Sequence, residues 1–538
     1  MVSTALSFLF PGLGHVAIGK YRRGAIMALP AFVLGLTVAV IAIFDRSALY
    51  QILSPNFLAS LLILDFVALV YHLWVMADGY RLASKFQPIR PGAGKLVSRG
   101  AVVLVFASAV TIHVGVASID LQAQQTLGCV MSPSGPCITD IQAGQSVPTF
   151  DYGDQDTPDT STSAPVVADT PSPTPGDTGS LAPEDTTAYP IPPACTGDSS
   201  NWAGSKCTLY LLLIGGDAGI GRAGYGPGKP INLRTDTMIL LQVDLSTGRS
   251  AMYGIPRNLL NVPLGKTDWN AYPYHFFPAL KTYGASLSGC GTNTSPCLFN
   301  ALWYDAAFAH PSRYPYSGNY FARATKAVED SVSALMGVSV AGAVVVDLAG
   351  FVDLVNALAP SGLKINSPYR VRQIPGTPYT NSNGVHVTGL DFPAGLQTLN
   401  GEQVLAYARL RHVVAHDSDT YRMARQQLVL NSLLNQVSPC EVALNISSVL
   451  SAVKGTLWTD LDWNDAPALA ALATKIKVRN VRTYVLSPSN GFNENVFPNV
   501  GDQTVLQKYQ AIVKKGLNGL PSAYASGSGG GAGGGFHC

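Results

Sequence analysis

The stretch "NLRTDTMILLQVDL", residues 232–245, places an arginine and an aspartate two positions apart at the start of a strongly apolar run. The run at 238–245 is short and continuous, which is typical of a strand buried inside a sheet. Opposite charges where a strand enters the core form either a structural ion pair or a site for a phosphate and its metal ion. The sequence on both sides has to distinguish these two interpretations.

Two further strands are predicted next to this run. The segment "CTLYLLLIGGDAG" contains an apolar run at 209–214, which two glycines close and Asp217 follows at once. A third strand at about 250–255 leads into Pro256 and Arg257. If the second strand runs antiparallel to the other two, one edge of the sheet collects the end of the first, the start of the second and the end of the third. That edge then carries Asp217, Arg234, Asp236 and Arg257.

The residue types at this edge suit a phosphate and a divalent cation. Edges of α/β sheets where loops converge are common ligand sites. One or two carboxylates, together with substrate phosphates, are a usual set of ligands for Mg²⁺. The guanidinium group of arginine matches phosphate oxygens bidentately. Two structural salt bridges are the alternative interpretation of the same four side chains.

A second constellation lies in residues 399–436, "LNGEQVLAYARLRHVVAHDSDTYRMARQQLVLNSLLNQ". We expect one helix to begin at Asn400 and another to be capped by Asp419. Arg422 and Gln426 share a face of the second helix, whereas Arg409 and Arg411 share a face only if the chain there is extended. Because cations are unfavourable near a helix N-terminus, the arginines indicate an anionic ligand there, with a solvated basic face as the alternative.

A histidine pair in the same segment is a weaker candidate for a metal or a base. His412 and His416 are four residues apart, and Asp417 follows the second. Structural or solvated roles for these side chains are the simpler interpretation.

The first 120 residues indicate a membrane anchor. Apolar stretches at 24–44, 57–76 and 101–119 each approach the ~20 residues that a spanning helix needs. Basic residues precede the first stretch and fill the loop between the second and third, so we expect a cytoplasmic N-terminus and an extracytoplasmic domain at the cell membrane. A buried helical hairpin of a soluble domain is the alternative. A net charge of +2 argues against a nucleic-acid-binding protein.

The cysteines agree with that orientation. All eight lie at or beyond Cys129, on one side of the predicted membrane segments, which favours disulfides in an oxidising compartment over zinc. Proximity in the sequence suggests three pairs and leaves two cysteines over: Cys129 with Cys137, Cys195 with Cys207, Cys290 with Cys297, and then Cys440 and Cys538.

Composition divides the chain into four parts. The membrane anchor at 1–120 is followed by an extracytoplasmic linker at 121–204, which is rich in Pro, Thr and Ser. Ordinary globular sequence fills 205–516, and a Gly-rich tail occupies 517–538.

The two constellations together resemble the LytR–CpsA–Psr family of bacterial cell-wall proteins. The matching segments are "LLLIGGDAG", "RTDTMILLQVD", "GIPRN", "AVVVDLAGFVDLVNAL" and "LNGEQVLAYARLRH…DSDTYRMARQQ", while "TDLDWNDAPALAALATKI" and "VRTYVL" look like the C-terminal part of the family domain. The resemblance covers about 205–515, with an expanded middle around 265–325. It implies an α/β/α sandwich with a mixed central β-sheet, here preceded by three transmembrane helices.

The resemblance also implies an activity and a site. Such proteins move a glycopolymer from an undecaprenyl-pyrophosphate carrier onto peptidoglycan and release undecaprenyl phosphate, which would make this chain a Mg²⁺-dependent phosphotransferase. Asp217 and Asp236 would hold the Mg²⁺ and, with Arg257, form the catalytic set. The pyrophosphate would be bound by Arg234, Arg257, Arg409, Arg411, Arg422 and Gln426.

One departure from the family pattern lies beside Arg257, and two other functions also remain open. The family usually has "IPRD" where this chain has "IPRN", so Asn258 replaces a carboxylate beside Arg257. A pyrophosphatase acting on the same lipid, or a scaffold that binds the lipid carrier without turnover, would use many of the same residues.

Overall fold

The computed structural model describes most of the chain outside its linker and tail. The described residues are 2–44, 46–86, 93–135, 191–195, 202, 205–216, 234–287, 289–377, 379–381, 385–415, 418–437, 445–454, 457–475, 481–488, 491–496 and 503–518. Several predictions fall outside them, namely those for Asp217, His416, Asp417, Cys137, Cys440, Cys538, the central part of the linker and the tail. The chain divides into two compact units, Met1–Leu127 with Trp463–Ala471 and Gly128–Asp462 with Leu472–Cys538.

The N-terminal unit is helical. Its elements are α1 (Val2–Leu9), α2 (Leu13–Ala17), α3 (Tyr21–Phe44), the short 3₁₀ segment η1 (Arg46–Leu53), α4 (Pro55–Phe86) and α5 (Ala93–Val130). Within the described residues, three segments are long and apolar enough to cross a membrane, Tyr21–Ile41, Pro55–Lys85 and Arg99–Val130, which confirms the three predicted apolar helices. In the second of them, Asp65 Oδ1 lies within hydrogen-bonding distance of His113 Nδ1 of the third, at 2.7 Å. A carboxylate inside a bilayer is costly unless it is paired, so a membrane-spanning position of this helix would require a partner such as His113.

The second unit is built on a mixed sheet of the order β13–β6–β1–β2–β3–β14. The bounds of its strands are β1 (Thr208–Gly216), β2 (Thr235–Asp244), β3 (Ser250–Ile255), β6 (Gly342–Asp347), β13 (Leu457–Thr459) and β14 (Val481–Val485). β2 is antiparallel to both β1 and β3, as predicted, while β6 is parallel to β1 and β14 is parallel to β3. The end of β1, the start of β2 and the end of β3 therefore meet at one edge.

The central strands are buried on both faces, which is why they are continuous apolar runs rather than alternating ones. Every residue of β3 is buried, and so are most residues of β1 and β2. Close strand packing also explains the glycines that close β1. A Cβ atom on Gly215 would lie 3.0 Å from the Cβ of Thr237 on β2, so a larger residue would push these two strands apart.

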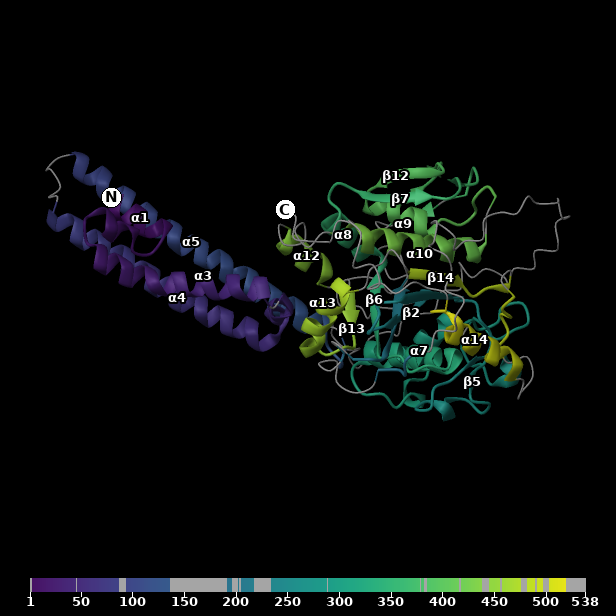
Figure 1. Ribbon diagram of the computed structural model, residues 1–538. Helices are drawn as coiled ribbons and strands as arrows, with labels where there is room; N and C mark the ends of the chain where they lie inside the picture. The colour runs from purple at the N-terminus through teal and green to yellow at the C-terminus, as the bar shows by residue number, and fades with distance from the viewer. Residues whose placement is uncertain are drawn as a thin grey trace. The chain divides into compact units, whose positions relative to one another are not determined.

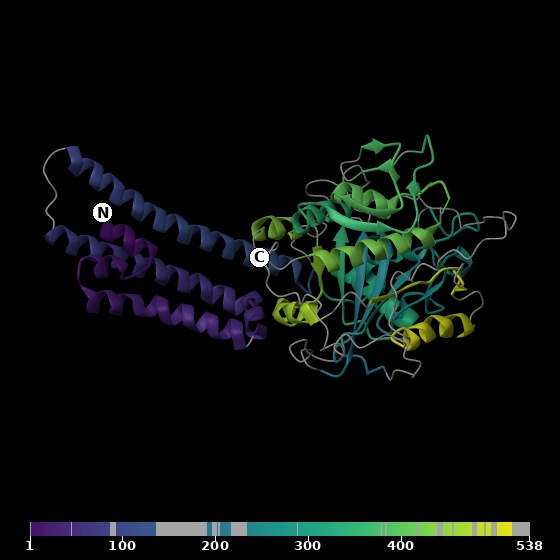
Figure 2. The same ribbon diagram turned by 45° about the horizontal axis from the view of Figure 1, so that its top comes forward.

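Helices cover both faces of the sheet (Figure 1). The bounds of the helices of this unit are α6 (Leu302–Tyr304), α7 (Tyr320–Met336), α8 (Leu348–Leu358), α9 (Gly401–Arg409), α10 (Asp419–Gln436), α12 (Ile446–Val453) and α14 (Gln503–Lys515). The helix α13 (Ala466–Lys475) is divided between the two units. α7 and α14 pack on one face, whereas α8 and α10 lie on the other, and Figure 2 shows α10 running across the strands. The predicted α/β/α sandwich with a mixed central sheet is confirmed.

Smaller elements surround this framework. Two-stranded ladders pair β4 (Val262–Pro263) with β5 (Phe276–Phe277), β7 (Leu363–Ser367) with β12 (Gly395–Leu399), β8 (Val371–Arg372) with β11 (Asp391–Phe392) and β9 (Tyr379–Thr380) with β10 (His386–Val387). Short helical turns of this unit are η3 (Trp269–Ala271), η4 (Lys281–Tyr283), η5 (Phe299–Ala301), the π-helical turn η6 (Asp305–Ala309) and η7 (Pro311–Arg313). The turn η8 (Trp463–Asp465) belongs to the N-terminal unit.

Disulfides form where the sequence predicts them in the described residues. Cys195 bonds Cys207, and Cys290 bonds Cys297 within the expanded middle segment. Cys129 is disulfide-bonded as well. The described residues contain no cluster of three or more His, Cys, Asp or Glu side chains able to hold a metal ion.

Candidate active site

Strand register brings Asp236 and Arg257 together at the predicted edge. Met238 of β2 pairs with Ile255 of β3, and continuing this antiparallel register by two residues sets Asp236 opposite Arg257. Arg257 Nη1 donates a hydrogen bond of 2.8 Å to Asp236 Oδ1. The Arg257 side chain is only 4% exposed, while that of Asp236 retains 25% exposure and so remains accessible to a ligand.

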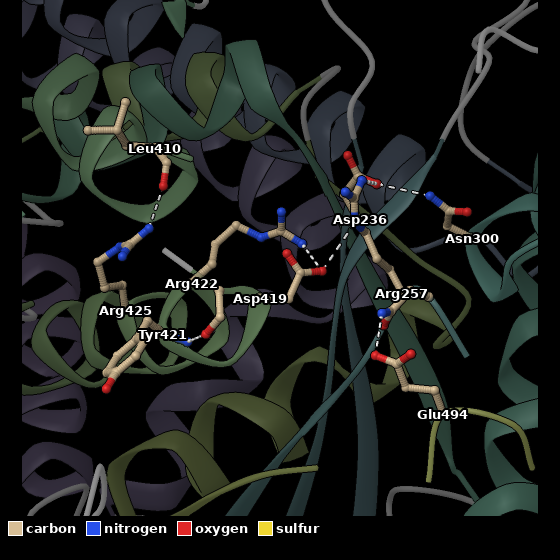
Figure 3. A network of polar contacts seen from close by, with 11 residues as sticks. Asp236, Arg257, Asn300, Leu410, Asp419, Tyr421, Arg422, Arg425 and Glu494 are labelled. Atoms are coloured by element: carbon tan, nitrogen blue, oxygen red, sulfur yellow. Dashed lines mark hydrogen bonds and ion pairs between the residues drawn. The ribbon is translucent and has the colours of Figure 1, made fainter. Parts of the chain in front are cut away.

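The start of α10 reaches the same edge through Asp419 (Figure 3). Arg422 Nη2 donates to Asp419 Oδ2 at 3.0 Å, and Arg257 Nε lies 3.6 Å from the same oxygen. The predicted cap of this helix is wrong by one residue. Ser418 is the N-cap and its side chain accepts from the Tyr421 N–H, which leaves the Asp419 carboxylate to bridge two arginines.

Arginine charge dominates the environment of Asp236. Burial favours the neutral acid, but the charges of Arg257, Arg422 and Arg234 outweigh burial and hold the pKa of Asp236 well below its usual range. Arg234, which is buried directly before β2, therefore belongs to the cluster. The sequence prediction that Arg234, Asp236 and Arg257 share one edge agrees with this geometry.

Arg422 is buried beside other positive charges. Burial lowers its pKa to about 10, and the neighbouring positive charges of Arg257 and Arg411 act in the same direction, while Asp419 and Asp236 oppose the shift. Arg411 is thereby placed beside Arg422. Four arginines, Arg234, Arg257, Arg411 and Arg422, surround the two carboxylates Asp236 and Asp419, so the site carries an excess of positive charge.

The other residues predicted on α9 and α10 have different environments. α9 ends at Arg409, and Leu410 leaves the helical conformation. Arg411 therefore lies after the helix, where an extended chain would let Arg409 and Arg411 share a face. The Arg409 guanidinium lies 5.8 Å from the centre of the Tyr379 ring and 3.5 Å from the Thr380 carbonyl oxygen. Gln426 is half-buried on α10.

Two neighbours of the predicted residues hold α10 in place. Arg425 is buried and donates to the carbonyl oxygens of Tyr407 and Leu410, which ties α10 to the end of α9. Gln427 donates to the carbonyl oxygen of Tyr484 at 2.9 Å and so fixes α10 over the β3–β14 pair. These two contacts explain how Asp419 and Arg422 come to lie at the end of β3.

Asn300 and Asn258 make contacts that no sequence pattern predicts. Asn300 Nδ2 donates to Asp236 Oδ1 at 3.2 Å, and it comes from the expanded middle segment, where no local pattern marks it. Asn258 Nδ2 donates to Glu494 Oε1 at 2.7 Å. Asn258, the amide that replaces the carboxylate usual in the family, thus pairs with Glu494. An aspartate at position 258 would repel that carboxylate.

Of the two predicted ligands of a divalent cation, only Asp236 lies within the described residues. Both described contacts of its carboxylate use Oδ1, from Arg257 and Asn300. The second oxygen remains available in a partly exposed carboxylate that stays ionised, which suits a hard cation. His412, by contrast, is exposed with φ 56°, and its carbonyl oxygen accepts from the Ile374 N–H.

A cavity of about 950 Å³ lies at the opposite edge of the sheet. Tyr210 near the start of β1 and Val340 before β6 line it, with Trp269, Met336 and Lys514. Because the arginine cluster lies at the other ends of these strands, this cavity is separate from the candidate active site.

The sequence model of the LytR_cpsA_psr family matches residues 312–515. Residues 312–515 belong to the LytR_cpsA_psr family. This region carries Asp419 and Arg422, while Asp236, Arg257 and Asn300 precede it in the chain. The match agrees with the resemblance recognised in the sequence motifs.

Curated relatives of this family domain include two proteins named for cell-wall roles. The chain is 26% identical to the polyisoprenyl-teichoic acid–peptidoglycan teichoic acid transferase TagU of Enterococcus faecalis over 189 residues, which is 35% of this chain and 56% of that protein. It is 33% identical to the cell wall biosynthesis protein LcpA of Corynebacterium glutamicum over 137 residues, 25% of this chain and 24% of that protein. The chain thus matches only about a quarter to just over half of the length of these relatives.

Two solved structures align with the chain at low identity and low TM-score. The crystal structure of Bacillus subtilis TagV aligns with 59% of this chain and 100% of its own, at 20% identity and a TM-score of 0.35. The structure titled TagT bound to LI-WTA aligns with 63% of this chain and 100% of its own, at 17% identity and a TM-score of 0.34.

Proposed function

We propose that this chain is a membrane-anchored phosphotransferase that moves a glycopolymer from an undecaprenyl-pyrophosphate carrier onto peptidoglycan and releases undecaprenyl phosphate. The observation that carries the proposal is the ion-pair network of Asp236, Arg257, Asp419 and Arg422 at the mouth of β2. TagU of E. faecalis is named for transfer of a polyisoprenyl-linked polymer to peptidoglycan, and its similarity supports the same reaction class here.

The arginines suit the charge of a pyrophosphate. Phosphoryl transfer needs positioning and charge neutralisation more than it needs a covalent protein nucleophile. Arg257 and Arg422 are buried guanidinium groups whose described counter-charges are Asp236 and Asp419. A pyrophosphate entering beside Asp236 would take over part of their pairing and would be held by Arg234 and Arg411 as well.

Asp236 has the properties of an electrostatic residue rather than a general base. A carboxylate whose pKa lies well below its usual range is a poor acceptor for the proton of a sugar hydroxyl. We assign Asp236, together with Asp217, to holding Mg²⁺, which when bound would neutralise charge on the pyrophosphate. Asn300 and Arg257 orient the Asp236 carboxylate through its Oδ1 atom.

The three apolar helices support anchoring in the cell membrane. Basic residues before the first span and between the second and third favour a cytoplasmic N-terminus. The catalytic domain would then lie outside the membrane, in an oxidising compartment, as the disulfides Cys195–Cys207 and Cys290–Cys297 suggest. Its substrates there would be the lipid-linked glycopolymer and the peptidoglycan acceptor.

The test uses the full-length protein in detergent or nanodiscs. It is mixed with a polyprenyl-pyrophosphate-linked sugar, a peptidoglycan oligomer and either Mg²⁺ or a chelator. Two products are measured, polyprenyl phosphate and the oligomer carrying the sugar. Arg257→Lys is compared with the wild type, because lysine keeps the charge at this position but loses the forked geometry that holds a phosphate.

The outcomes separate three functions. Mg²⁺-dependent attachment of the sugar that falls in Arg257→Lys supports the transferase. Release of polyprenyl phosphate without attachment to any offered oligomer replaces it with a pyrophosphatase. Tight binding of the lipid with no turnover replaces it with a carrier-binding scaffold.

A further inference from the structure

A second constellation of catalytic residue types lies in the expanded middle segment, just before the family match at 312–515. Ser286 Oγ lies 3.1 Å from His310 Nε2, and His310 Nδ1 lies 2.5 Å from Asp305 Oδ1. None of these three residues belongs to the candidate active site described above. They form the linear chain of hydroxyl, imidazole and carboxylate that activates a serine nucleophile.

A π-helical turn brings the carboxylate and the imidazole together. η6 spans Asp305–Ala309, and the His310 N–H closes the turn by donating to the Asp305 carbonyl oxygen at 2.8 Å. The five-residue spacing places the two side chains on one side of the turn. Such π-helical turns cost stability relative to an α-helix and are frequent at functional sites.

Asp305 is arranged to accept from three donors. It is fully buried, and its Oδ2 atom accepts from the hydroxyls of Tyr272 at 2.8 Å and Tyr314 at 2.5 Å, which leaves Oδ1 for His310. Burial and the Asp305 charge raise the pKa of Tyr272 and of Tyr314 above their ordinary values, so both remain protonated donors. The carboxylate is thereby held in the orientation that fixes the imidazole of His310.

Ser286 is presented to solvent on an anchored loop. Its residue is exposed, while its neighbours Ala285 and Leu287 are buried. The Ala285 N–H donates to the Leu280 carbonyl oxygen at 3.2 Å, and the disulfide Cys290–Cys297 closes the chain a few residues later. The nucleophile is therefore accessible, although the backbone on both sides of it is held.

We propose that Ser286, His310 and Asp305 form a second catalytic site that hydrolyses carboxylic esters. Because Ser286 is exposed, its hydroxyl is accessible to the acyl carbon of an ester that approaches from solvent. An ester is favoured over an amide because an alcohol is expelled more easily than an amine. The inference does not depend on the proposed transferase activity.

The reaction balances with water as the only co-reactant. Ser286 Oγ forms a bond to the carbonyl carbon of the ester and transfers its proton to His310 Nε2. The bond from that carbon to the alcohol oxygen breaks, and His310 returns the proton to the departing alcohol. Water then attacks the acyl-serine by the same route, which releases the carboxylic acid and restores the Ser286 hydroxyl. His310 is the catalytic base and Asp305 is a positioning residue.

The test uses the full-length protein in detergent with a fluorophosphonate probe and p-nitrophenyl acetate. We expect the probe to modify Ser286, identified by peptide mass spectrometry, and Ser286→Ala to lose both labelling and ester hydrolysis. His310→Gln lowers the rate by about 10²-fold or more. Ser317→Ala, which removes an exposed serine of the same segment, retains wild-type labelling.

Asp305→Asn distinguishes a positioning role from a structural one. It lowers kcat for the ester by about 10²-fold or more while KM stays near the wild-type value, because the substrate does not touch Asp305. A wild-type protein that neither labels nor hydrolyses the ester overturns the proposal. Labelling at another serine, or labelling that survives His310→Gln at the full rate, overturns it as well. Because Ser286 is exposed, the Ser286→Ala result stands even if Asp305→Asn fails to fold.

Discussion

Asp236 and Arg257 face each other across the β2–β3 pair and form a 2.8 Å ion pair where β2 begins and β3 ends. The pair is 21 residues apart in the sequence, and the antiparallel register alone brings the two side chains together. Asp419 then joins Arg257 to Arg422 on α10, so that the sheet and a helix share one charged network. A change to any one of these side chains should therefore alter the electrostatics of the others.

Replacing Asp236 with asparagine should abolish most of the transfer activity. The change keeps the shape of the side chain but removes the charge that Arg257, Arg422 and Arg234 stabilise. We expect the rate of sugar attachment to fall by about 10²–10³-fold, in the range found when a residue stabilising transition-state charge is lost. Product formation by the full-length protein measures this effect. Asp353→Asn, at an exposed position of α8, is the matched control and should leave the rate unchanged, so equal losses in both variants would refute the assignment.

Replacing Asn300 with alanine should have a smaller effect. Its amide donates to Asp236 Oδ1. Loss of this hydrogen bond, while Arg257 still pairs with the carboxylate, costs about 1 kcal/mol, or roughly five-fold in rate. The loss should appear in kcat rather than in KM for the lipid substrate, because Asn300 orients Asp236 rather than the pyrophosphate. Asn435→Ala on the exposed part of α10 is the control. An unchanged kcat in Asn300→Ala would exclude a positioning role.

Replacing Asp268 with asparagine should stabilise the protein at alkaline pH. Burial, with the neighbouring Asp330 charge in second place, raises the pKa of Asp268 to about 7. When folding raises the pKa of a carboxyl group, its contribution to stability is fully present below its unfolded pKa of about 4. That contribution is lost as the pH rises through 7. The difference in melting temperature between Asp268→Asn and wild type should therefore be near zero at pH 4 and should grow to several degrees at pH 8.

Thermal unfolding of the two proteins across pH 4–8 checks the sign of this effect. Asp353→Asn serves again as the control and should show no comparable trend. A stabilisation by Asp268→Asn that is largest at acidic pH would contradict a pKa of Asp268 that burial raises.

Removing the disulfide Cys290–Cys297 should destabilise the expanded middle segment. Both cysteines are buried within the core that α7 and the sheet share, and serine in their place would bury hydroxyl groups as well as release the loop. We expect Cys290→Ser with Cys297→Ser to lower the free energy of unfolding by about 2–3 kcal/mol. Chemical denaturation under non-reducing conditions measures it, and addition of a reductant should bring the wild type towards the double variant. A wild type that is insensitive to the reductant and as stable as the variant would count against the prediction.

Much of the candidate site follows from local features of the sequence. Apolar runs fix the strands, and their directions predict that Arg234, Asp236 and Arg257 share an edge. Asn400 begins α9 with a capping box that includes Gln403, as a helix start signal predicts. Asp419 was identified only as a cap, because its sequence neighbours do not reveal that Arg257 lies 3.6 Å away.

Local sequence features account for a large part of the architecture. Hydrophobic runs, their lengths and the positions of charged residues at their ends predict three apolar helices and three antiparallel strands with charged residues at one edge, because these properties depend on residues close together in the chain. The mixed sheet was implied by the family resemblance. Tertiary packing alone decided that Asn300 reaches Asp236, that Asp419 bridges two arginines, and that Ser286 meets His310. Each of these contacts joins segments whose separation along the chain leaves no periodic signal, and only the packing of α10 and the middle segment against the core brings their polar atoms within hydrogen-bonding distance.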